Sequence, residues 1–153
     1  MDYDVRVKEI EARPTVVIRT ETAPKSLGET FAELLPEVSA YLDAKGVQSA
    51  GPAFGRFFDY TKDRVDMEAG FPVASPGEGE GRVEPSELPG GRVGVALHVG
   101  PYTALPHAYE AMTAWMKEQG LESAGASWEV YWTGPRDVAD SSQWRTEIVW
   151  PVR

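Results

Sequence analysis

The chain contains two copies of one local pattern, and this internal repeat constrains its fold more than any other feature. The stretch GVQSAG at residues 46–51 resembles GLESAG at 120–125, and EAGFPV at 68–73 resembles EIVWPV at 147–152. The two stretches come in the same order and at a comparable separation in each half. Such self-similarity indicates a structural unit that has been duplicated.

Each copy has the pattern of a strand, a helix and two further strands. Residues 15–20 are rich in β-branched residues, which is typical of strands, and 92–99 is predicted to be the corresponding strand of the second copy. Apolar residues at helical spacing follow in both halves, from Leu27 to Leu42 and from Leu105 to Met116. Two more strands are predicted after each helix, at 52–60 and 64–73 and at 127–132 and 144–152. Alternation at Val5 and Val7 adds a strand at the start of the chain.

These elements predict an α+β fold of duplicated βαββ modules that form an antiparallel sheet with two helices on one face. A ligand cleft is expected at the pseudo-two-fold axis between the modules, because concave sites between substructures bind small ligands. We expect a single domain over 1–153, with repeat one at about 1–75, a linker at about 76–91 and repeat two at about 92–153. Glycine, proline and glutamate dominate 74–91, which favours a flexible connector, and a lid over the site is the alternative.

Charge and composition exclude several classes of function. The chain of 153 residues has 24 acidic and 15 basic residues, a net charge of −9, which disfavours nucleic acid and anionic membranes as partners. The absence of cysteine excludes disulfides, thiolate catalysis and cysteine metal sites. No apolar run long enough for a bilayer span and no secretory signal are visible, so a cytoplasmic location is expected.

Neither a metal nor a cofactor is predicted from the residues. His98 and His107 are the two histidines, and their spacing does not fit a zinc site, which needs three or four ligands. Haem ligation by one histidine is a weaker alternative.

Several short segments together resemble the GyrI-like small-molecule-binding family. They are WEVY at 128–131, Gly134-Pro135, TEI at 146–148, Pro151-Val152, and HVGPY at 98–102 before the second helix. The resemblance implies an effector-binding module like those of AraC-type and MerR-type activators, which bind bulky cationic or aromatic drugs. Other relatives resemble hydrolases that open cyclopropane-bearing toxins, and the haem-binding SOUL proteins share the duplicated fold. Since this chain starts at its first strand, without the helix-turn-helix domain of the activators, we expect no DNA binding by the chain itself.

Glu147 is the first candidate for the ligand carboxylate. Strand alternation places it opposite in facing to Thr146, Ile148 and Trp150. A partly desolvated carboxylate among aromatic residues would have a raised pKa and would suit pairing with a cation or general-base chemistry. The alternative is a solvated glutamate on an outer face.

A second candidate group consists of Glu129 and Tyr131, which lie two residues apart and therefore on the same face. The alternative is a salt bridge from Glu129 to Arg145 beside a packed tyrosine. Tyr102 is expected either to point into the cleft or to close the start of the second helix. Trp150 and its repeat partner Phe71 are the expected pocket aromatics, with Trp128 and Trp132 in the core. The predicted ligand-binding residues are thus Glu147, Glu129, Tyr131, Trp150, Tyr102, Phe71, Phe57 and Glu68.

The predicted function is a stand-alone module that binds a hydrophobic, cationic or aromatic small molecule, to sequester it or to sense it for a separate regulator protein. The alternative is a small hydrolase of strained electrophiles, in which Glu147 would activate water and Tyr102 would assist. Because both functions would use the same cavity, the sequence leaves the choice open.

Overall fold

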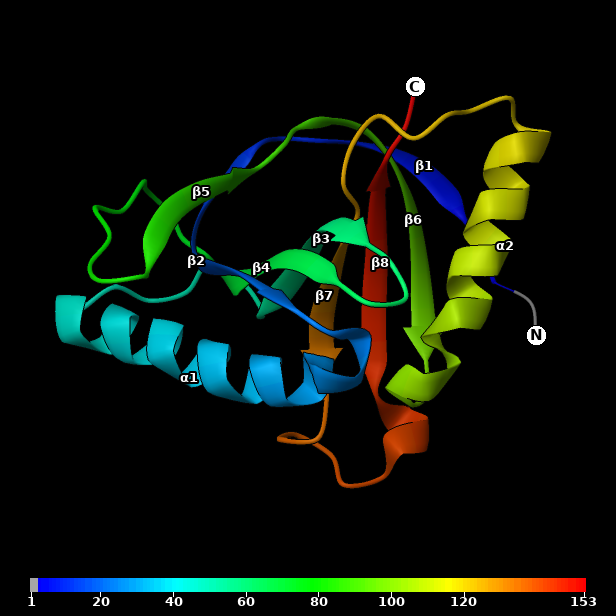
Figure 1. The fold of residues 1–153 in the computed structure, drawn as a ribbon. Coiled ribbons are helices and arrows are strands. Elements are labelled where there is room, and N and C mark those ends of the chain that lie inside the picture. Colours follow the sequence, from blue (N-terminus) through cyan, green and yellow to red (C-terminus); the bar gives the residue numbers. More distant parts are fainter. Residues whose placement is uncertain (1–2) are drawn as a thin grey trace. The chain divides into compact units, whose positions relative to one another are not determined.

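Each repeat forms four antiparallel strands and one α-helix in a computed structural model that describes residues 3–153 (Figure 1). The chain divides into two compact units. We call Glu11–Gly90 the first-repeat unit, and the residues up to Ile10 together with Gly91–Arg153 the second-repeat unit. This agrees with the predicted α+β fold built from duplicated βαββ modules.

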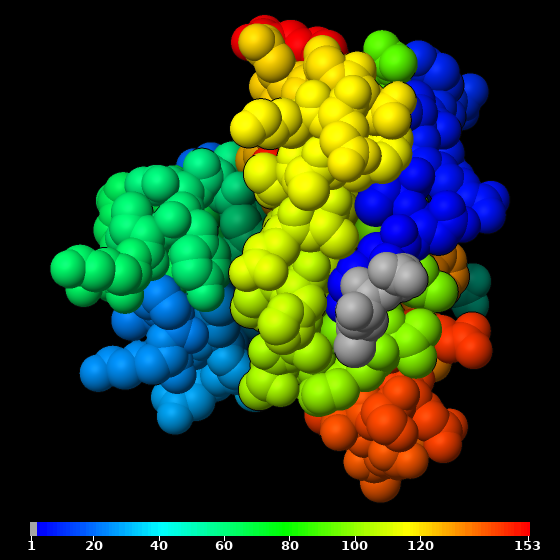
Figure 2. All heavy atoms as spheres, turned by 90° about the vertical axis from the view of Figure 1, so that its right-hand side faces the viewer, coloured from blue at the N-terminus to red at the C-terminus, as the bar shows by residue number. Residues whose placement is uncertain are grey.

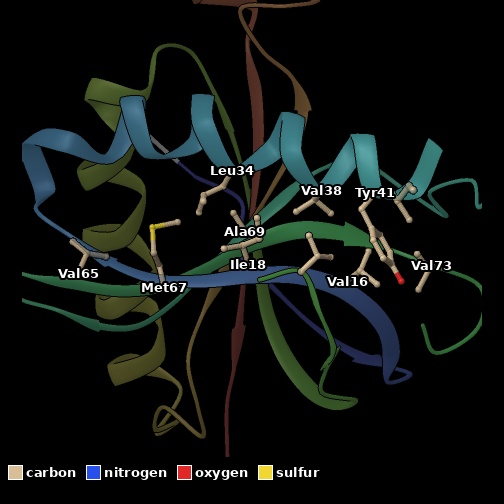
Figure 3. Packing of buried hydrophobic residues seen from close by; sticks show 11 residues of the cluster. Val16, Ile18, Leu34, Val38, Tyr41, Val65, Met67, Ala69 and Val73 are labelled. Atoms are coloured by element: carbon tan, nitrogen blue, oxygen red, sulfur yellow. The ribbon is translucent and has the colours of Figure 1, made fainter. Parts of the chain in front are cut away.

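The first-repeat unit contains its strands in the order β3-β4-β2-β5. Helix α1 packs on one face of β2 and β4, where apolar side chains from both strands and the helix form a core (Figure 3). The alternation of Val16 and Ile18 with Val17 explains why one side of β2 faces the helix. The elements are β2 (Arg13–Thr22), η1 (Pro24–Ser26), α1 (Leu27–Lys45), β3 (Phe54–Tyr60), β4 (Val65–Pro72) and β5 (Glu84–Leu88).

The second-repeat unit has the strand order β1-β6-β8-β7. Helix α2 packs on β6, and Ala108 and Met112 of the helix meet Ala96 and Ile148 of the strands in the core. In Figure 2, α2 (yellow-green to yellow) faces the viewer with the β1 segment (blue) beside it, so the outward side of the helix is open to solvent. The elements are β1 (Arg6–Ile10), β6 (Gly91–Val99), η2 (Tyr102–Ala104), α2 (Leu105–Glu118), β7 (Trp128–Thr133), η3 (Ser141–Gln143) and β8 (Arg145–Pro151).

The strand registers confirm that the repeats are equivalent residue by residue. Glu68 pairs with Arg19 and Arg56 on the two strands beside β4, and Glu147 holds the same position on β8. Phe71 and Trp150 follow at the same distance. Even the irregularity is repeated, because β3 shifts register after Phe57 and β7 shifts after Tyr131, its equivalent. A bulge at the same place in both units is a feature of the duplicated fold.

The composition of 76–91 predicted a linker, and that prediction is wrong for residues 84–88. Glu84–Leu88 forms strand β5, which pairs with β2 from Arg13↔Leu88 to Val17↔Glu84. Pro85 is tolerated because β5 is an edge strand, where a missing backbone donor costs little. The buried side chains of Val83 and Leu88 hold the segment against the first-repeat unit.

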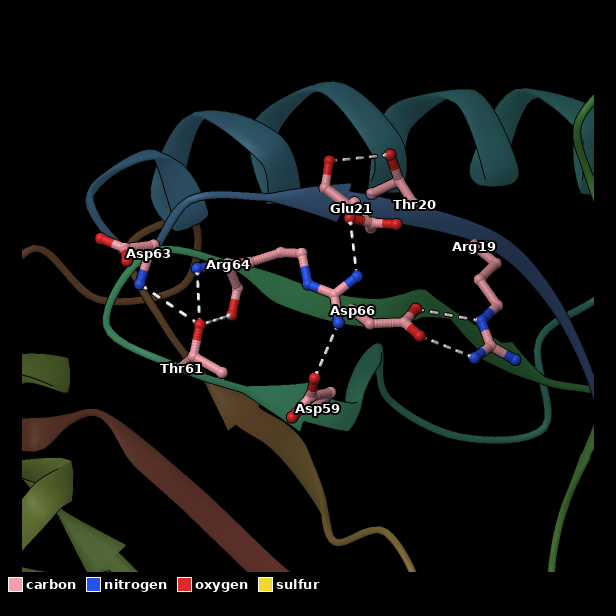
Figure 4. A network of polar contacts seen from close by, with 8 residues as sticks. All are labelled: Arg19, Thr20, Glu21, Asp59, Thr61, Asp63, Arg64 and Asp66. Atoms are coloured by element: carbon pink, nitrogen blue, oxygen red, sulfur yellow. Dashed lines mark hydrogen bonds and ion pairs between the residues drawn. The ribbon is translucent and has the colours of Figure 1, made fainter.

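A network of exposed ion pairs ties β2, β3 and β4 together (Figure 4). Arg19 makes two hydrogen bonds to Asp66, at 3.2 and 3.0 Å, and Arg64 reaches Glu21 and Asp59 at 3.2 and 2.8 Å. Exposed pairs of this kind each contribute roughly 0–1 kcal/mol. Because each arginine already has carboxylate partners, we regard the network as structural.

Within residues 3–153 no helix is long and apolar enough to cross a membrane.

Candidate functional site

A buried carboxylate on β7 lies at the centre of the candidate site. Glu129 and Tyr131 pair with Ile148 and Thr146 of β8, so all four side chains project to the side that α2 covers. Glu129 is only 7% exposed. An acidic group this deep requires compensation, because burying a charge without a partner is costly.

Two phenols supply hydrogen bonds to that carboxylate. Tyr109 of α2 donates to Oε2 of Glu129 at 2.6 Å, and Tyr131 donates to Oε1 at 2.9 Å. Each carboxylate oxygen therefore has one donor, one from the helix and one from the strand. No lysine, arginine or histidine within residues 3–153 forms an ion pair with Glu129.

Aromatic rings extend this arrangement on both sides. Tyr102 meets Tyr131 edge-on at 5.9 Å between ring centroids. The ring centroid of Tyr102 also lies 4.9 Å from that of Trp144, and the ring centroids of Tyr109 and Trp150 are 6.1 Å apart. We call these residues together the Glu129 cluster: Tyr102, Tyr109, Glu129, Tyr131, Trp144 and Trp150.

Burial sets the protonation of the cluster. Desolvation raises the pKa of Glu129, and the hydrogen bonds from Tyr109 and Tyr131 oppose that rise. Desolvation and the neighbouring charge of Glu129 raise the pKa of Tyr131 well above its usual range, and both causes also raise the pKa of Tyr102. Tyr131 and Tyr102 therefore remain protonated at neutral pH, and the carboxyl group of Glu129 lies among aromatic rings with no cation beside it.

His98 positions Tyr102 through the turn between them. The His98 ring is fully buried. Its Nε2 lies 3.0 Å from the Pro101 carbonyl oxygen, and its Nδ1 lies 2.8 Å from the Tyr3 hydroxyl. Since a carbonyl only accepts, Nε2 donates to Pro101, and Nδ1 is hydrogen-bonded to the Tyr3 hydroxyl. This contact fixes the Gly100-Pro101 turn immediately before Tyr102. With both ring nitrogens engaged, His98 gives no support to haem ligation.

Gly134 makes room for Tyr102. A Cβ at this glycine would lie 2.6 Å from the Tyr102 hydroxyl, closer than side chains pack. The loop is held in place by Trp144, whose indole nitrogen donates to the Val138 carbonyl at 2.7 Å. Gly134 is one of the residues that carry the resemblance described above, and it thus has a packing role in this site.

The structure brings together four of the eight predicted ligand-binding residues: Tyr102, Glu129, Tyr131 and Trp150. Glu147 is half-buried on the face of the sheet away from α2, opposite to the face that carries this group. Strand alternation predicted that Glu147 and Trp150 point to opposite faces, and they do. The expected salt bridge from Glu129 to Arg145 is absent from the described residues, because the two side chains leave opposite faces.

The other predicted site residues belong to the first-repeat unit. Phe57 and Phe71 pack against its core under α1. Glu68 is 3% exposed on the opposite face and accepts a long hydrogen bond from Ser86 at 3.3 Å. Trp128 is buried, as expected for a core residue, but Trp132 is 52% exposed, so its core assignment is wrong. The register shift after Tyr131 explains the error, because it interrupts simple alternation at that residue.

Sequence reasoning missed Tyr109 and Trp144 as site residues. Tyr109 falls in the apolar stripe of α2, where its spacing indicates only that it faces the sheet. Its polar role depends on the register that places Glu129 beneath it. No group of three or more histidine, aspartate or glutamate side chains in residues 3–153 is arranged to hold a metal ion.

Comparison with known proteins gives a family and a fold. The family model for the GyrI-like small molecule binding domain matches residues 3–153. No curated protein matches the sequence at a significant level.

Solved structures agree with this match. The crystal structure of the EcmrR C-terminal domain has a TM-score of 0.90 and 25% identity, covering 100% of this chain and 99% of that one. EcmrR in its complex with DNA has a TM-score of 0.88 and 25% identity, with 99% of this chain covering 57% of that chain. The chain therefore spans little more than half of that EcmrR chain. SAV2435 bound to tetraphenylphosphonium has a TM-score of 0.70 at 13% identity, covering 100% and 94%, which shows a shared fold alone.

Proposed function

The chain belongs to the GyrI-like small-molecule-binding family, and we propose that it binds an apolar cation at the Glu129 cluster. The observation that carries this proposal is a carboxylate, 7% exposed, with two phenol donors and no cationic partner among the described residues. A bound cation would supply the missing charge.

The energetics favour a cation that is also apolar. A buried charge without a partner is strongly destabilising, so a bound cation should stabilise ionised Glu129 more than it would stabilise an exposed glutamate. The rings of Tyr102, Tyr109 and Trp150 attract a cation through their π faces when it lies within about 6 Å. Aromatic walls also favour ligands with large apolar surfaces.

Proteins of similar structure support this ligand class. SAV2435 has been solved with tetraphenylphosphonium, a bulky cation with four aromatic rings. The EcmrR C-terminal domain, which this chain resembles over its whole length, is part of a protein solved on DNA. We propose accordingly that this chain senses or sequesters such a compound, in the first case for a separate regulator protein.

The test is a paired titration with tetraphenylphosphonium and the neutral triphenylphosphine oxide, followed by tryptophan fluorescence. Glu129→Gln keeps the shape and an acceptor oxygen for one of the two phenols while it removes the charge. It should weaken binding of the cation more than about tenfold and change binding of the neutral probe little. Glu147→Gln is the matched control on the opposite face and should change neither affinity.

Two outcomes would contradict the proposal. Equal losses for both probes in Glu129→Gln would make Glu129 a structural residue. A selective loss of cation binding in Glu147→Gln would move the site to the other face of the sheet. Thermal unfolding of each variant shows whether a loss of binding is a loss of folding.

A second candidate function is hydrolysis of a strained, cyclopropane-type electrophile. It is favoured by the raised pKa of Glu129, because a carboxyl group with a pKa closer to neutrality suits general-base activation of water. Product formation beyond one equivalent, measured by mass spectrometry and lost in Glu129→Gln, would support it. Unchanged compound would exclude it for that substrate.

A further inference from the structure

The face of the second-repeat sheet that is turned away from α2 carries an isolated acidic group among apolar side chains. We call it the outer face. Leu97 and Val99 of β6 are 46% and 50% exposed there. They pair directly with Glu147 and Arg145 of β8, and Val130 of β7 lies on the other side of Glu147.

The first repeat shows what is unusual about Glu147. Its equivalent, Glu68, has two cationic cross-strand neighbours, Arg19 and Arg56. Their charges oppose the rise that burial gives to the pKa of Glu68. The same two positions in the second repeat are Leu97 and Val130. The second repeat thus has the equivalent carboxylate, with apolar residues where the first repeat has two cations.

Within residues 3–153, the side chains of Glu147 and Arg145 make no ion pair and no hydrogen bond. Only the backbone N–H of Arg145 donates, to the hydroxyl of Thr133. The two residues are one pleat apart and project to the same face of β8. On β6, β7 and β8 the outer face therefore presents one negative and one positive group side by side, bordered by exposed apolar side chains. On the edge strand β1 the same face carries Lys8 and Arg6, and Arg6 is already paired with Asp4. Such a surface is complementary to itself.

We propose that the outer face binds a second copy of this chain, about a two-fold axis that crosses the strands at the level of Thr146. That symmetry reverses the strand direction, so Glu147 of each copy faces Arg145 of the other. Leu97 and Val99 are then buried between two sheets that pack face to face. A two-fold axis along the strands would instead place like charges opposite one another.

Charge complementarity is what selects a second copy as the occupant. Each copy has a net charge of −9, so two copies repel unless local pairs of opposite charge offset that repulsion. The two reciprocal Glu147–Arg145 pairs supply this, and the apolar border excludes water from them. Like charges in place of these pairs would disfavour the contact strongly.

Sedimentation velocity over a range of about 1 µM to 1 mM protein measures the association directly. The wild type should show a concentration-dependent monomer–dimer equilibrium. Glu147→Arg and Arg145→Glu, each alone, should weaken it at least about tenfold, because each places like charges opposite one another. A mixture of the two variants should associate again, since one chain then offers two basic groups to two acidic groups of the other.

Glu110→Arg on the exposed side of α2 is the control, because it makes the same change in net charge as Glu147→Arg away from the outer face. It should leave the dissociation constant unchanged. A wild type that is monomeric throughout, a dimer that tolerates both reversals, or a mixture that stays monomeric would overturn the proposal. Circular dichroism of each variant checks its fold, and re-association in the mixture requires that both variants are folded.

Discussion

The phenol oxygen of Tyr109 lies 2.6 Å from Oε2 of Glu129 and joins helix α2 to strand β7. Tyr131 holds the other carboxylate oxygen at 2.9 Å. A ligand that reaches this carboxylate has to compete with, or share, the two phenols. The contact therefore links the stability of α2 to the chemistry of the site.

Tyr109→Phe should lower the free energy of unfolding by about 1–3 kcal/mol, because it leaves one oxygen of a buried carboxylate without a donor. Urea unfolding at neutral pH measures the change. Tyr60→Phe is the control, since that ring is 56% exposed and its hydroxyl has no hydrogen bond in the described residues. Equal effects of the two substitutions would show that the hydrogen bond from Tyr109 to Glu129 does not contribute to stability.

The stability of the protein should depend on the ionisation of Glu129. Desolvation raises the pKa of this carboxyl in the folded chain, whereas the unfolded chain ionises near the ordinary value of about 4.3. Between these two values the folded state binds more protons, so stability falls as the pH rises through the raised pKa. Glu129→Gln should remove this part of the slope.

Unfolding free energies of wild type and Glu129→Gln, measured from about pH 4 to pH 8, isolate the effect. Burial also raises the pKa of Glu68, with the same sign, but Glu68 is present in both proteins and cancels in the difference. Parallel curves over the whole range would show that the pKa of Glu129 is not raised.

Gly134→Ala should disturb the site through Tyr102. The new Cβ would lie 2.6 Å from the Tyr102 hydroxyl, so the Tyr102 ring has to shift relative to Tyr131 and Trp144. Overpacking of this kind costs about 1–3 kcal/mol, and near-ultraviolet circular dichroism should change with it. At Gly125 a Cβ would meet nothing closer than 3.8 Å, so Gly125→Ala should leave the spectrum unchanged. An unaltered spectrum for Gly134→Ala would contradict the packing role.

Two other glycines should respond in opposite directions. A Cβ at Gly70 in β4 would overlap the backbone carbonyl oxygen of Val16, so Gly70→Ala should prevent stable folding. A Cβ at Gly28 in α1 meets nothing within 4 Å, so Gly28→Ala should stabilise the helix by up to about 1 kcal/mol. Thermal unfolding of both variants, compared with wild type, measures the two effects. A folded Gly70→Ala variant of normal stability would contradict the register of β2 on β4.

Local periodicity in the sequence predicted the repeat and the order of helices and strands. It also predicted that Glu147 lies on the opposite face of its strand from Thr146 and Ile148. Which side of the sheet the helix covers could not be predicted. Alternation divides a strand into two faces without saying which face is buried. For this reason Glu147 was a stronger candidate than Glu129, although Glu129 is the carboxylate beneath α2.

Features that depend on pairing with distant strands were also missed. Strand β5 lies in a segment rich in glycine and proline, and only its pairing with β2 makes it a strand. Tyr109 carries the spacing of a core residue, and its hydrogen bond is determined by the register of β7. Both cases show tertiary context deciding a role that local composition leaves open.

The position of a bound probe tests the proposed site most directly. In a crystal structure of the complex with tetraphenylphosphonium, we expect the cation beside Glu129, with at least one ring among Tyr102, Tyr109 and Trp150 within about 6 Å. The hydrogen bond from Tyr109 to Glu129 should lengthen or break as the ligand enters. A probe bound against Glu147 on the outer face, with the Glu129 cluster unchanged, would contradict the proposed site.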